Sequence, residues 1–233
     1  MGIIPCPPSG YCVKKLERVI DFNNAIITKP PFIREEISDL DLQSCARKCL
    51  TFGCTCSAIL HSSRIRSCKV LGDMIGSQSL GSVSPEEGWK FYITAKGCEP
   101  GWLQYETHCY FFGESEVTWM EAKSECEGSC SYLVEIETKE ESDWLAQTFL
   151  FKDTCPSDIY LSCHAWTGGN DLTVEGRYQW SHSNKSINFT NWFDIEPYTP
   201  DKEDCIQLLM NGEWNDGTCS DKTQYICEKS DGS

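Results

Sequence analysis

The sequence lacks the segments that would insert it into a membrane or attach it to one. No run of eighteen apolar residues occurs in its 233 residues, so no segment is suited to cross a bilayer as a helix. The N-terminus has neither the basic nor the apolar stretch of a signal peptide, and Cys6 stands where a myristoylation pattern needs Ser or Thr. We expect a secreted, extracellular chain whose signal peptide has already been removed.

Histidine is scarce, which argues against zinc binding and catalysis. The four histidines are scattered, at His61, His108, His164 and His182. No C-x2-C or H-x3–5-H spacing supports a zinc site, and no nucleophile and base converge in the sequence, so we expect no enzymatic activity. The sixteen cysteines therefore indicate disulfides, which persist in oxidising compartments.

Basic residues are rare in the second part of the chain. From Cys98 onward, seven Lys and one Arg stand against twenty-six Asp and Glu, a net charge of −18, whereas residues 1–97 carry +3. Such an acidic surface repels nucleic acid and anionic membranes. It suits divalent cations, basic partners or mineral surfaces, although surface acids also serve solubility alone.

Seven cysteines precede residue 98, and four of them define a small helix-and-strand pattern. Ser38 and Asp39 are candidate N-caps of a helix that carries Cys45 and Cys49 on one face. Short strands are expected around Cys56 and Cys68, and a further strand over residues 89–94.

This pattern resembles the PAN/apple family over about residues 20–96. The resemblance implies the disulfides Cys45–Cys68 and Cys49–Cys56, which would stabilise a core too small to hold itself. Ahead of the match, Cys6–Cys12 is expected to close a small loop. We therefore expect residues 1–97 to form a PAN/apple-like domain with a cysteine-containing N-terminal extension.

The rest of the chain contains a long series of short motifs. One helix is expected over residues 118–126, with Trp119, Ala122 and Cys126 along one stripe, and a second from Thr138, an N-cap with Glu141 three residues on. The remaining segments are Cys98–Trp102, His108–Phe112, Tyr132–Ile136, Ala165–Gly169, Gly176–Trp180, Thr190–Trp192, Glu203–Ile206, Asn211–Asp216 and Tyr225–Glu228.

In order and spacing these motifs resemble the long form of the C-type lectin domain over residues 98–229. The resemblance implies an α+β fold with two helices, a double-looped mixed sheet and an irregular loop between about residues 168 and 203, followed by a disordered tail at 230–233. It also implies the disulfides Cys98–Cys109, Cys126–Cys227 and Cys205–Cys219.

Four cysteines remain: Cys54, Cys130, Cys155 and Cys163. Cys155–Cys163 is a short local closure. Parity then leaves Cys54 and Cys130, one in each domain, which we expect to form an inter-domain disulfide; two free or intermolecular thiols are the alternative.

The long loop carries the oxygen-bearing side chains that Ca²⁺ prefers. The resemblance places the principal, sugar-binding calcium site at Glu196, Glu203, Asn215 and Asp216. It places an auxiliary calcium site at Asp171, Glu175 and Asp204, with Glu203 shared. A cis bond before Pro197 would turn its flanking side chains toward one ion. Acidic loops are also common without a metal, but the spacing at two sites favours calcium.

Two residues depart from the family pattern. Tyr198 stands where the sugar-binding motif has Asn or Asp, and a phenol is a poor calcium ligand at neutral pH. Thr199 stands where the auxiliary site often has an acid. Calcium affinity should therefore be weakened. Tyr198 would either stack on the apolar face of a sugar or shield the loop.

Two functions remain open at this stage. The first is a secreted, calcium-dependent lectin for adhesion or glycan recognition, with sugar contacts from Glu196, Tyr198, Glu203, Asn215 and Asp216. The second is a non-sugar lectin-like module that binds a protein or mineral surface. Sequons at Asn184 and Asn188 favour a secreted glycoprotein. The sequence leaves the sugar, the ligand of the N-terminal domain and the oligomeric state open. Four tryptophans are expected in the core: Trp166, Trp180, Trp192 and Trp214.

Overall fold

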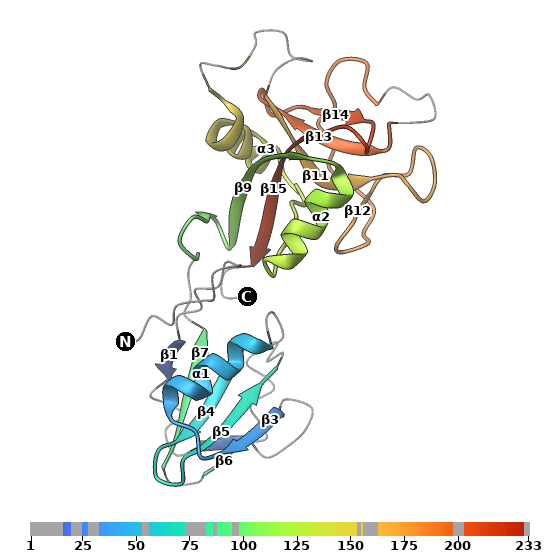
Figure 1. The fold of residues 1–233 in the computed structure, drawn as a ribbon. Coiled ribbons are helices and arrows are strands. Elements are labelled where there is room, and N and C mark those ends of the chain that lie inside the picture. The colour runs from blue at the N-terminus through green and yellow to red at the C-terminus, as the bar shows by residue number, and fades with distance from the viewer. Residues whose placement is uncertain are drawn as a thin grey trace. The chain divides into compact units, whose positions relative to one another are not determined.

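The chain folds into two compact units in a computed structural model (Figure 1). The structure describes residues 16–19, 25–27, 33–52, 56–72, 83–85, 88–94, 98–152, 155, 163–197 and 203–230. The units divide between Pro100 and Gly101, compared with an expected boundary after residue 97. Ser230 ends the last strand rather than beginning a tail.

The first unit is built on a five-stranded antiparallel sheet. Its strands, in spatial order, are β1 (Leu16–Val19), β7 (Trp89–Thr94), β4 (Ala58–Ser62), β5 (Ser67–Leu71) and β3 (Ile33–Ser38). A separate pair joins β2 (Ala25–Ile27) to β6 (Val83–Pro85). Strands β4 and β5 are buried along their whole length, so this pair forms the centre of the unit.

Helix α1 (Leu42–Thr51) begins later than expected. The prediction of an N-cap at Ser38 or Asp39 is wrong. Asp41 is the cap, because its carboxylate accepts a 2.7 Å hydrogen bond from the N–H of Ser44. Ser38 instead ends β3, and Asp39 has a left-handed backbone with φ 61°.

Two disulfides hold α1 against the sheet. Cys45 and Cys49 are buried, and they bond to Cys68 on β5 and to Cys56 just before β4, as the sequence predicted. Ile59 belongs to the same small core. A core of this size gains much of its stability from such cross-links.

The second unit contains a mixed sheet that agrees with the lectin-like prediction. Its main path runs through β14 (Trp214–Gly217), β13 (Cys205–Leu209), β11 (His164–Asn170), β15 (Thr223–Ser230), β9 (His108–Val117) and β8 (Leu103–Tyr105). Beside this path, β10 (Tyr132–Leu133) pairs with β15 and β12 (Gln179–Trp180) with β11. Only the β11–β15 pairing, among the described strands, is parallel.

The second unit has two α-helices, both anticipated from the sequence, and each begins after a threonine cap. Thr118 caps α2 (Trp119–Gly128) in a full capping box with Glu121, and Thr138 caps α3 (Lys139–Leu145). Trp119, Ala122 and Cys126 are all buried, as their spacing indicated. A π-helical turn, η4 (Ala146–Leu150), continues α3, and no sequence signal predicted it.

Disulfides also cross-link the second unit. The structure contains Cys126–Cys227, Cys155–Cys163 and Cys205–Cys219, the pairs expected from the sequence. Cys98, Cys109 and Cys130 are disulfide-bonded as well. The pairings Cys98–Cys109 and Cys54–Cys130 stay predictions; Cys54, Cys6 and Cys12 lie outside the described residues.

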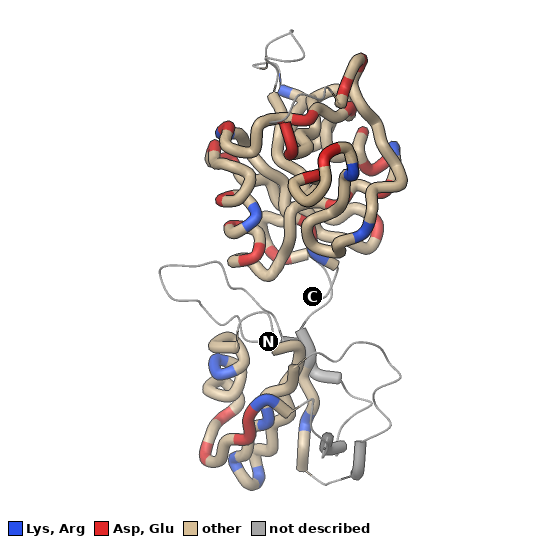
Figure 2. The backbone as a smooth tube through the Cα atoms, turned by 90° about the vertical axis from the view of Figure 1, so that its right-hand side faces the viewer, with Lys and Arg blue, Asp and Glu red and all other residues tan. Residues whose placement is uncertain are grey.

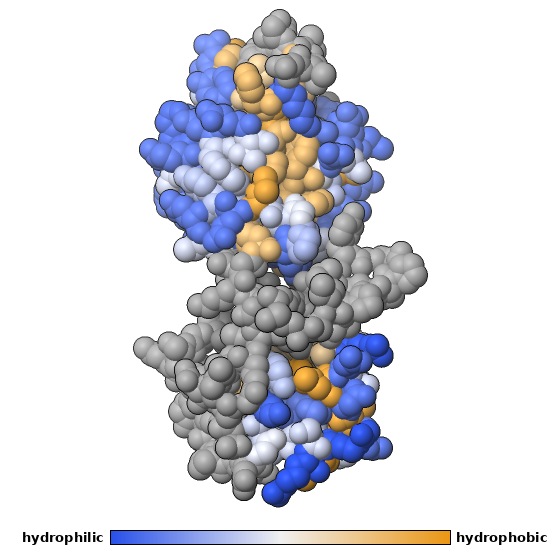
Figure 3. All heavy atoms as spheres, turned by 90° about the vertical axis from the view of Figure 1, so that its left-hand side faces the viewer, coloured by the Kyte–Doolittle hydropathy of each residue, from blue (hydrophilic) through white to orange (hydrophobic). Residues whose placement is uncertain are grey.

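The second unit has both acidic and hydrophobic surface. Acidic residues are spread widely along its backbone (Figure 2), in keeping with the net charge of −18 from Cys98 onward. A band of hydrophobic surface runs down one face between hydrophilic borders (Figure 3). Within the part of the chain that is described, no helix has the length and apolarity to cross a membrane.

Candidate functional site

The first candidate residue, Asp171, lies directly after β11 and is only 1% exposed. Its backbone N–H donates to the carbonyl of Asp204, 3.1 Å away, so two of the three acids predicted for the auxiliary site are adjacent. Its Oδ2 accepts a 2.7 Å hydrogen bond from the N–H of Gly176. Its Oδ1 is buried and makes no hydrogen bond to any residue that the structure describes. A buried carboxylate oxygen without a donor is costly unless a cation is bound to it.

Electrostatic repulsion connects the acids of the two predicted calcium sites. Burial raises the pKa of Asp171, and the nearby carboxylates of Asp204 and Asp216 raise it further. Burial also raises the pKa of Glu203, again with a contribution from Asp216. Like charges gathered at partly buried positions disfavour ionisation, so a bound cation would relieve the repulsion.

Asp216 and Asn215 lie side by side on β14, but their side chains have different partners. Asp216 is 2% exposed, and its Oδ2 accepts a 3.1 Å hydrogen bond from the hydroxyl of Tyr178. The amide nitrogen of Asn215 donates to Oε1 of Gln207, its cross-strand neighbour on β13, at 3.2 Å. The two side chains therefore make separate hydrogen bonds, although the residues are adjacent in the strand.

Glu196 is half-buried, and its backbone N–H donates to the carbonyl of Phe193 at 2.8 Å. The Glu196–Pro197 peptide bond is cis, the conformation that the calcium interpretation anticipated. Glu175 is exposed in the turn that follows Asp171. Tyr198 and Thr199 lie outside the described residues.

The predicted ligand side chains are of the types that calcium prefers, although they do not form a complete coordination sphere. Among the described residues, no three His, Cys, Asp or Glu side chains are close enough together to hold a metal ion. The residues are nevertheless carboxylates and amides, the oxygen ligands that Ca²⁺ takes. The unpartnered Oδ1 of Asp171 and the mutual repulsion of its neighbours both fit a cation at this position.

The four tryptophans are packing residues rather than exposed platforms. Trp166, Trp180 and Trp214 are at most 5% exposed, and the ring of Trp192 meets that of Trp214 with centroids 5.9 Å apart. The indole N–H of Trp214 donates to Oγ of Ser142 at 2.9 Å. Trp214 therefore anchors the strand that presents Asn215 and Asp216.

Sequence reasoning missed one member of the site, Tyr178. The segment Gly176–Trp180 was identified as a motif, but its tyrosine carries no metal-ligand signature. Its contact with Asp216 spans 38 residues of sequence, so only the folded chain reveals it.

The two glycosylation sequons lie on the surface. Asn184 and Asn188 are exposed, and so are the hydroxyl residues Ser186 and Thr190 that complete each sequon. The amide nitrogen of Asn184 donates to the carbonyl of His182 at 3.4 Å, within a turn where Asn184 has φ 56°.

A separate groove lies away from these acids. It has a volume of about 490 Å³ and is lined by Asp143, Ala146, Gln147, Phe151, Met210 and Asn211. Phe151 is 66% exposed at its edge. Its lining combines apolar side chains with a carboxylate and two amides, which suits a protein side chain better than a metal.

The second unit is similar in sequence to known proteins. Residues 115–229 match the family model described as the lectin C-type domain. The chain is 32% identical over 148 residues to a perlucin-like protein of Mytilus galloprovincialis, covering 59% of this chain and 91% of that protein. It is 30% identical over 148 residues to the low affinity immunoglobulin epsilon Fc receptor of Mus musculus, covering 60% of this chain but only 41% of the receptor.

A solved structure shares the same fold. The cow C-type carbohydrate-recognition domain of CD23, crystallised in the presence of a GlcNAc2Man3 oligosaccharide, aligns with a TM-score of 0.50 and 28% identity. The alignment covers 58% of this chain and 98% of that domain.

Proposed function

Because the chain belongs to the C-type lectin family, we propose that its second unit is a calcium-dependent carbohydrate-binding module. The observation that carries the proposal is the buried Asp171 carboxylate, whose Oδ1 has no donor among the described residues and whose neighbours Asp204 and Asp216 repel it. The resemblance also places acids and amides of this unit at calcium positions of the family, with Tyr198 as a departure from the motif.

Two groups of residues would hold calcium. Glu196, Glu203, Asn215 and Asp216 form the principal site, and Asp171, Glu175 and Asp204 the auxiliary one. When bound, calcium supplies a Lewis-acidic centre that accepts two adjacent sugar hydroxyl groups. The carboxylates of Glu196 and Glu203 would accept hydrogen bonds from those hydroxyls, and the Asn215 amide would donate one. A charged acceptor makes such hydrogen bonds strong, so these side chains would orient the sugar ring.

Tyr198 would affect both the calcium affinity and the sugar contacts of the principal site. It replaces an amide or carboxylate of the family motif, so calcium binding should be weaker than in members that retain one. Its aromatic ring would stack on the apolar face of a sugar or shield the loop.

We propose that the first unit is a PAN/apple-like module for adhesion or partner binding. Its support is the α1 helix disulfide-bonded through Cys45 and Cys49 to the sheet. The density of disulfides in both units also supports secretion, because such bonds persist in oxidising compartments. We propose a binding protein without enzymatic activity.

A glycan array would test the carbohydrate proposal. The purified chain should bind a subset of glycans in millimolar calcium and lose that binding in EDTA. The double variant Glu196→Ala with Asp216→Ala should bind none of them. Signals that persist equally in EDTA and in the double variant would contradict calcium-dependent recognition.

A non-sugar interaction is the second candidate function. The groove beside Phe151 and the net charge of −18 from Cys98 onward favour a basic protein partner. Such an interaction would survive the Glu196→Ala and Asp216→Ala changes but should weaken when Phe151→Ser alters the edge of the groove.

A further inference from the structure

Tyr178 lies beside the acids proposed to hold calcium and just before β12. Its hydroxyl donates a 3.1 Å hydrogen bond to Oδ2 of Asp216, and its ring packs against Trp192 with centroids 4.9 Å apart. A phenol has an ordinary pKa of about 10, so the hydroxyl of Tyr178 is protonated at neutral pH and can donate this hydrogen bond.

The acceptor of this hydrogen bond, Asp216, is buried and its backbone is held in a strand. Asp216 is 2% exposed on β14, where its backbone pairs with Ile206. A carboxylate can rotate about its last bond, which would change the direction in which each oxygen points. The hydrogen bond from Tyr178 fixes Oδ2, and in doing so it also fixes the direction of Oδ1.

We propose that Tyr178 is a positioning residue of the principal calcium site, which holds the Asp216 carboxylate in the orientation that a cation requires. The inference rests on the proposed function, since it assigns a role toward calcium. Groups that hydrogen-bond to metal-ligating side chains orient those ligands, and their removal typically weakens metal binding about 10–100-fold. Tyr178 itself is not a ligand.

The chain offers a matched control for this interaction. The hydroxyl of Tyr110 on β9 donates a 2.6 Å hydrogen bond to Oε1 of Glu141 on α3. This is also a tyrosine bonded to a buried carboxylate, but Glu141 is not among the proposed calcium ligands. Tyr110→Phe thus removes a similar bond without touching the site.

Calcium titrations of Tyr178→Phe, Tyr110→Phe and the unchanged protein test the inference. Each variant loses one hydroxyl and keeps its ring, and melts in EDTA confirm that each is folded. Titration calorimetry gives the calcium affinity, and tryptophan fluorescence gives a second readout because Trp192 contacts Tyr178. Tyr178→Phe should bind calcium about tenfold more weakly or worse. Tyr110→Phe should stay within about twofold of the unchanged protein, since additivity holds for independent sites.

Three outcomes would overturn the inference, and they are distinguishable. Equal affinities of the unchanged protein and Tyr178→Phe would leave the proposed function standing and remove the role of Tyr178. Equal weakening in both variants would indicate general loosening of the fold instead of positioning. An unchanged protein that binds no calcium would overturn the proposed function together with this inference.

Discussion

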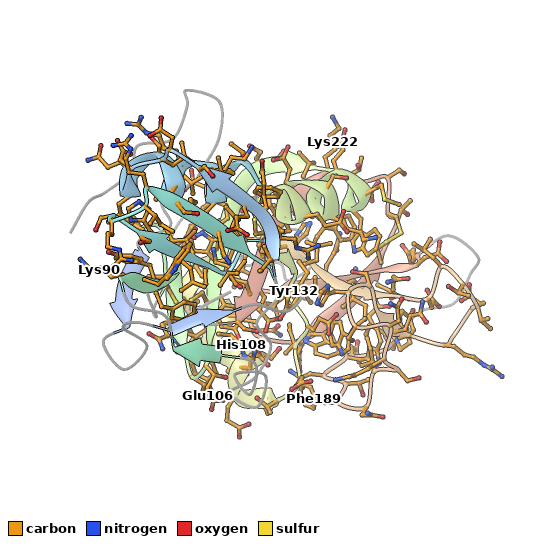
Figure 4. The ribbon with its side chains drawn as sticks, turned by 90° about the horizontal axis from the view of Figure 1, so that it is seen from below. Lys90, Glu106, His108, Tyr132, Phe189 and Lys222 are labelled. Carbon is orange, nitrogen blue, oxygen red and sulfur yellow. A yellow bond between two sulfur atoms is a disulfide. The ribbon has the colours of Figure 1, made fainter. Side chains whose placement is uncertain are left out.

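Nδ1 of His108 lies 3.6 Å from Oε1 of Glu228, a carboxyl group in a residue that is only 3% exposed. His108 is labelled in Figure 4 together with Tyr132, whose hydroxyl group also interacts with Glu228. Oε2 of Glu228 accepts a 2.9 Å hydrogen bond from the N–H of Glu135. Burial raises the pKa of Glu228 to about 8, and the neighbouring acids Glu141 and Glu135 contribute to the rise.

The first prediction is that folding stability falls as pH rises from about 4.5 to 8. Glu228 has its ordinary pKa of 4.5 when unfolded and about 8 when folded, so over this range the folded state holds the proton more tightly. Its contribution to stability is therefore fully present below pH 4.5 and is lost as pH rises through 8. One group changes the free energy of unfolding by at most about 1.4 kcal/mol per pH unit.

Urea denaturation at several pH values would measure this slope. Glu228→Gln cannot ionise, so its unfolding free energy should depend less steeply on pH than that of the unchanged protein. Burial also raises the pKa of Glu141, Asp171 and Glu203, so part of the slope should remain in the variant. Identical slopes for the two proteins would refute the assignment to Glu228.

The second prediction concerns calcium and thermal stability. A ligand that binds only the folded state stabilises it by mass action. With the affinities of about 10⁻⁴–10⁻³ M common in extracellular modules, 10 mM calcium should add about 1–3 kcal/mol. Calorimetric melts in calcium and in EDTA would show the shift. It should be smaller in the Glu196→Ala, Asp216→Ala double variant, which loses two principal ligands but keeps the proposed auxiliary ligands, and a melt insensitive to EDTA would rule out a structural calcium.

The third prediction addresses Tyr198, which lies outside the described residues. Tyr198→Asn restores the amide of the family motif, so it should tighten calcium binding and move sugar preference toward mannose-like ligands. Tyr198→Phe is the matched control, because it keeps the ring and restores no amide. Calorimetry and a glycan array would record both effects. No change in either would mean that Tyr198 does not line the site.

The fourth prediction concerns Ser142, which is fully buried beneath the strand of the site. Its Oγ accepts from the indole N–H of Trp214 at 2.9 Å and donates to the carbonyl of Gly212 at 2.8 Å. Ser142→Ala leaves the Trp214 N–H without this acceptor and should cost about 1–3 kcal/mol of unfolding free energy.

Ser124→Ala provides the control for that measurement. The Ser124 hydroxyl makes an exposed 3.0 Å bond to the carbonyl of Met120 within α2, so its loss should change stability by less than about 0.5 kcal/mol. Chemical denaturation of both variants gives the comparison. If the Ser142→Ala and Ser124→Ala variants were equally stable, the two hydrogen bonds of the Ser142 hydroxyl would make no net contribution to stability.

Local signals in the sequence predicted much of the fold. Thr138 caps α3 as expected, because the cap and the residue whose N–H it accepts are only three positions apart. The strand at 89–94 was likewise found at its predicted bounds. The N-cap of α1 was misplaced, since Ser38, Asp39 and Asp41 are all suitable residues and only the pairing of β3 with β5 selects among them.

Features that depend on long-range contacts could not be predicted in the same way. The π-helical turn after Leu145 and the burial of Glu228 have no local signature. The resemblance supplied the candidate calcium ligands, but it could not indicate that Asn215 bonds Gln207 while Asp216 bonds Tyr178. Those partners are chosen by strand register, which only the folded sheet establishes.

The fifth prediction concerns Cys130, which is disulfide-bonded. We expect its partner to be Cys54, in the first domain. Peptide mapping under non-reducing conditions should then recover one linked pair that joins a segment before Cys98 to a segment after it. Finding Cys130 linked only within its own domain, or between two chains, would contradict this pairing.

The antiparallel pairing of β9 with β15 determines how the second unit would respond to tension. His108 lies opposite Ser230, so a force that pulls the unit's two ends apart would open this ladder from one end, one hydrogen bond at a time. The opening would soon reach Cys227, which is bonded to Cys126 across 101 residues of sequence. Load would then pass through the disulfide, and the residues between 127 and 226, the proposed calcium ligands among them, would be shielded from stretching.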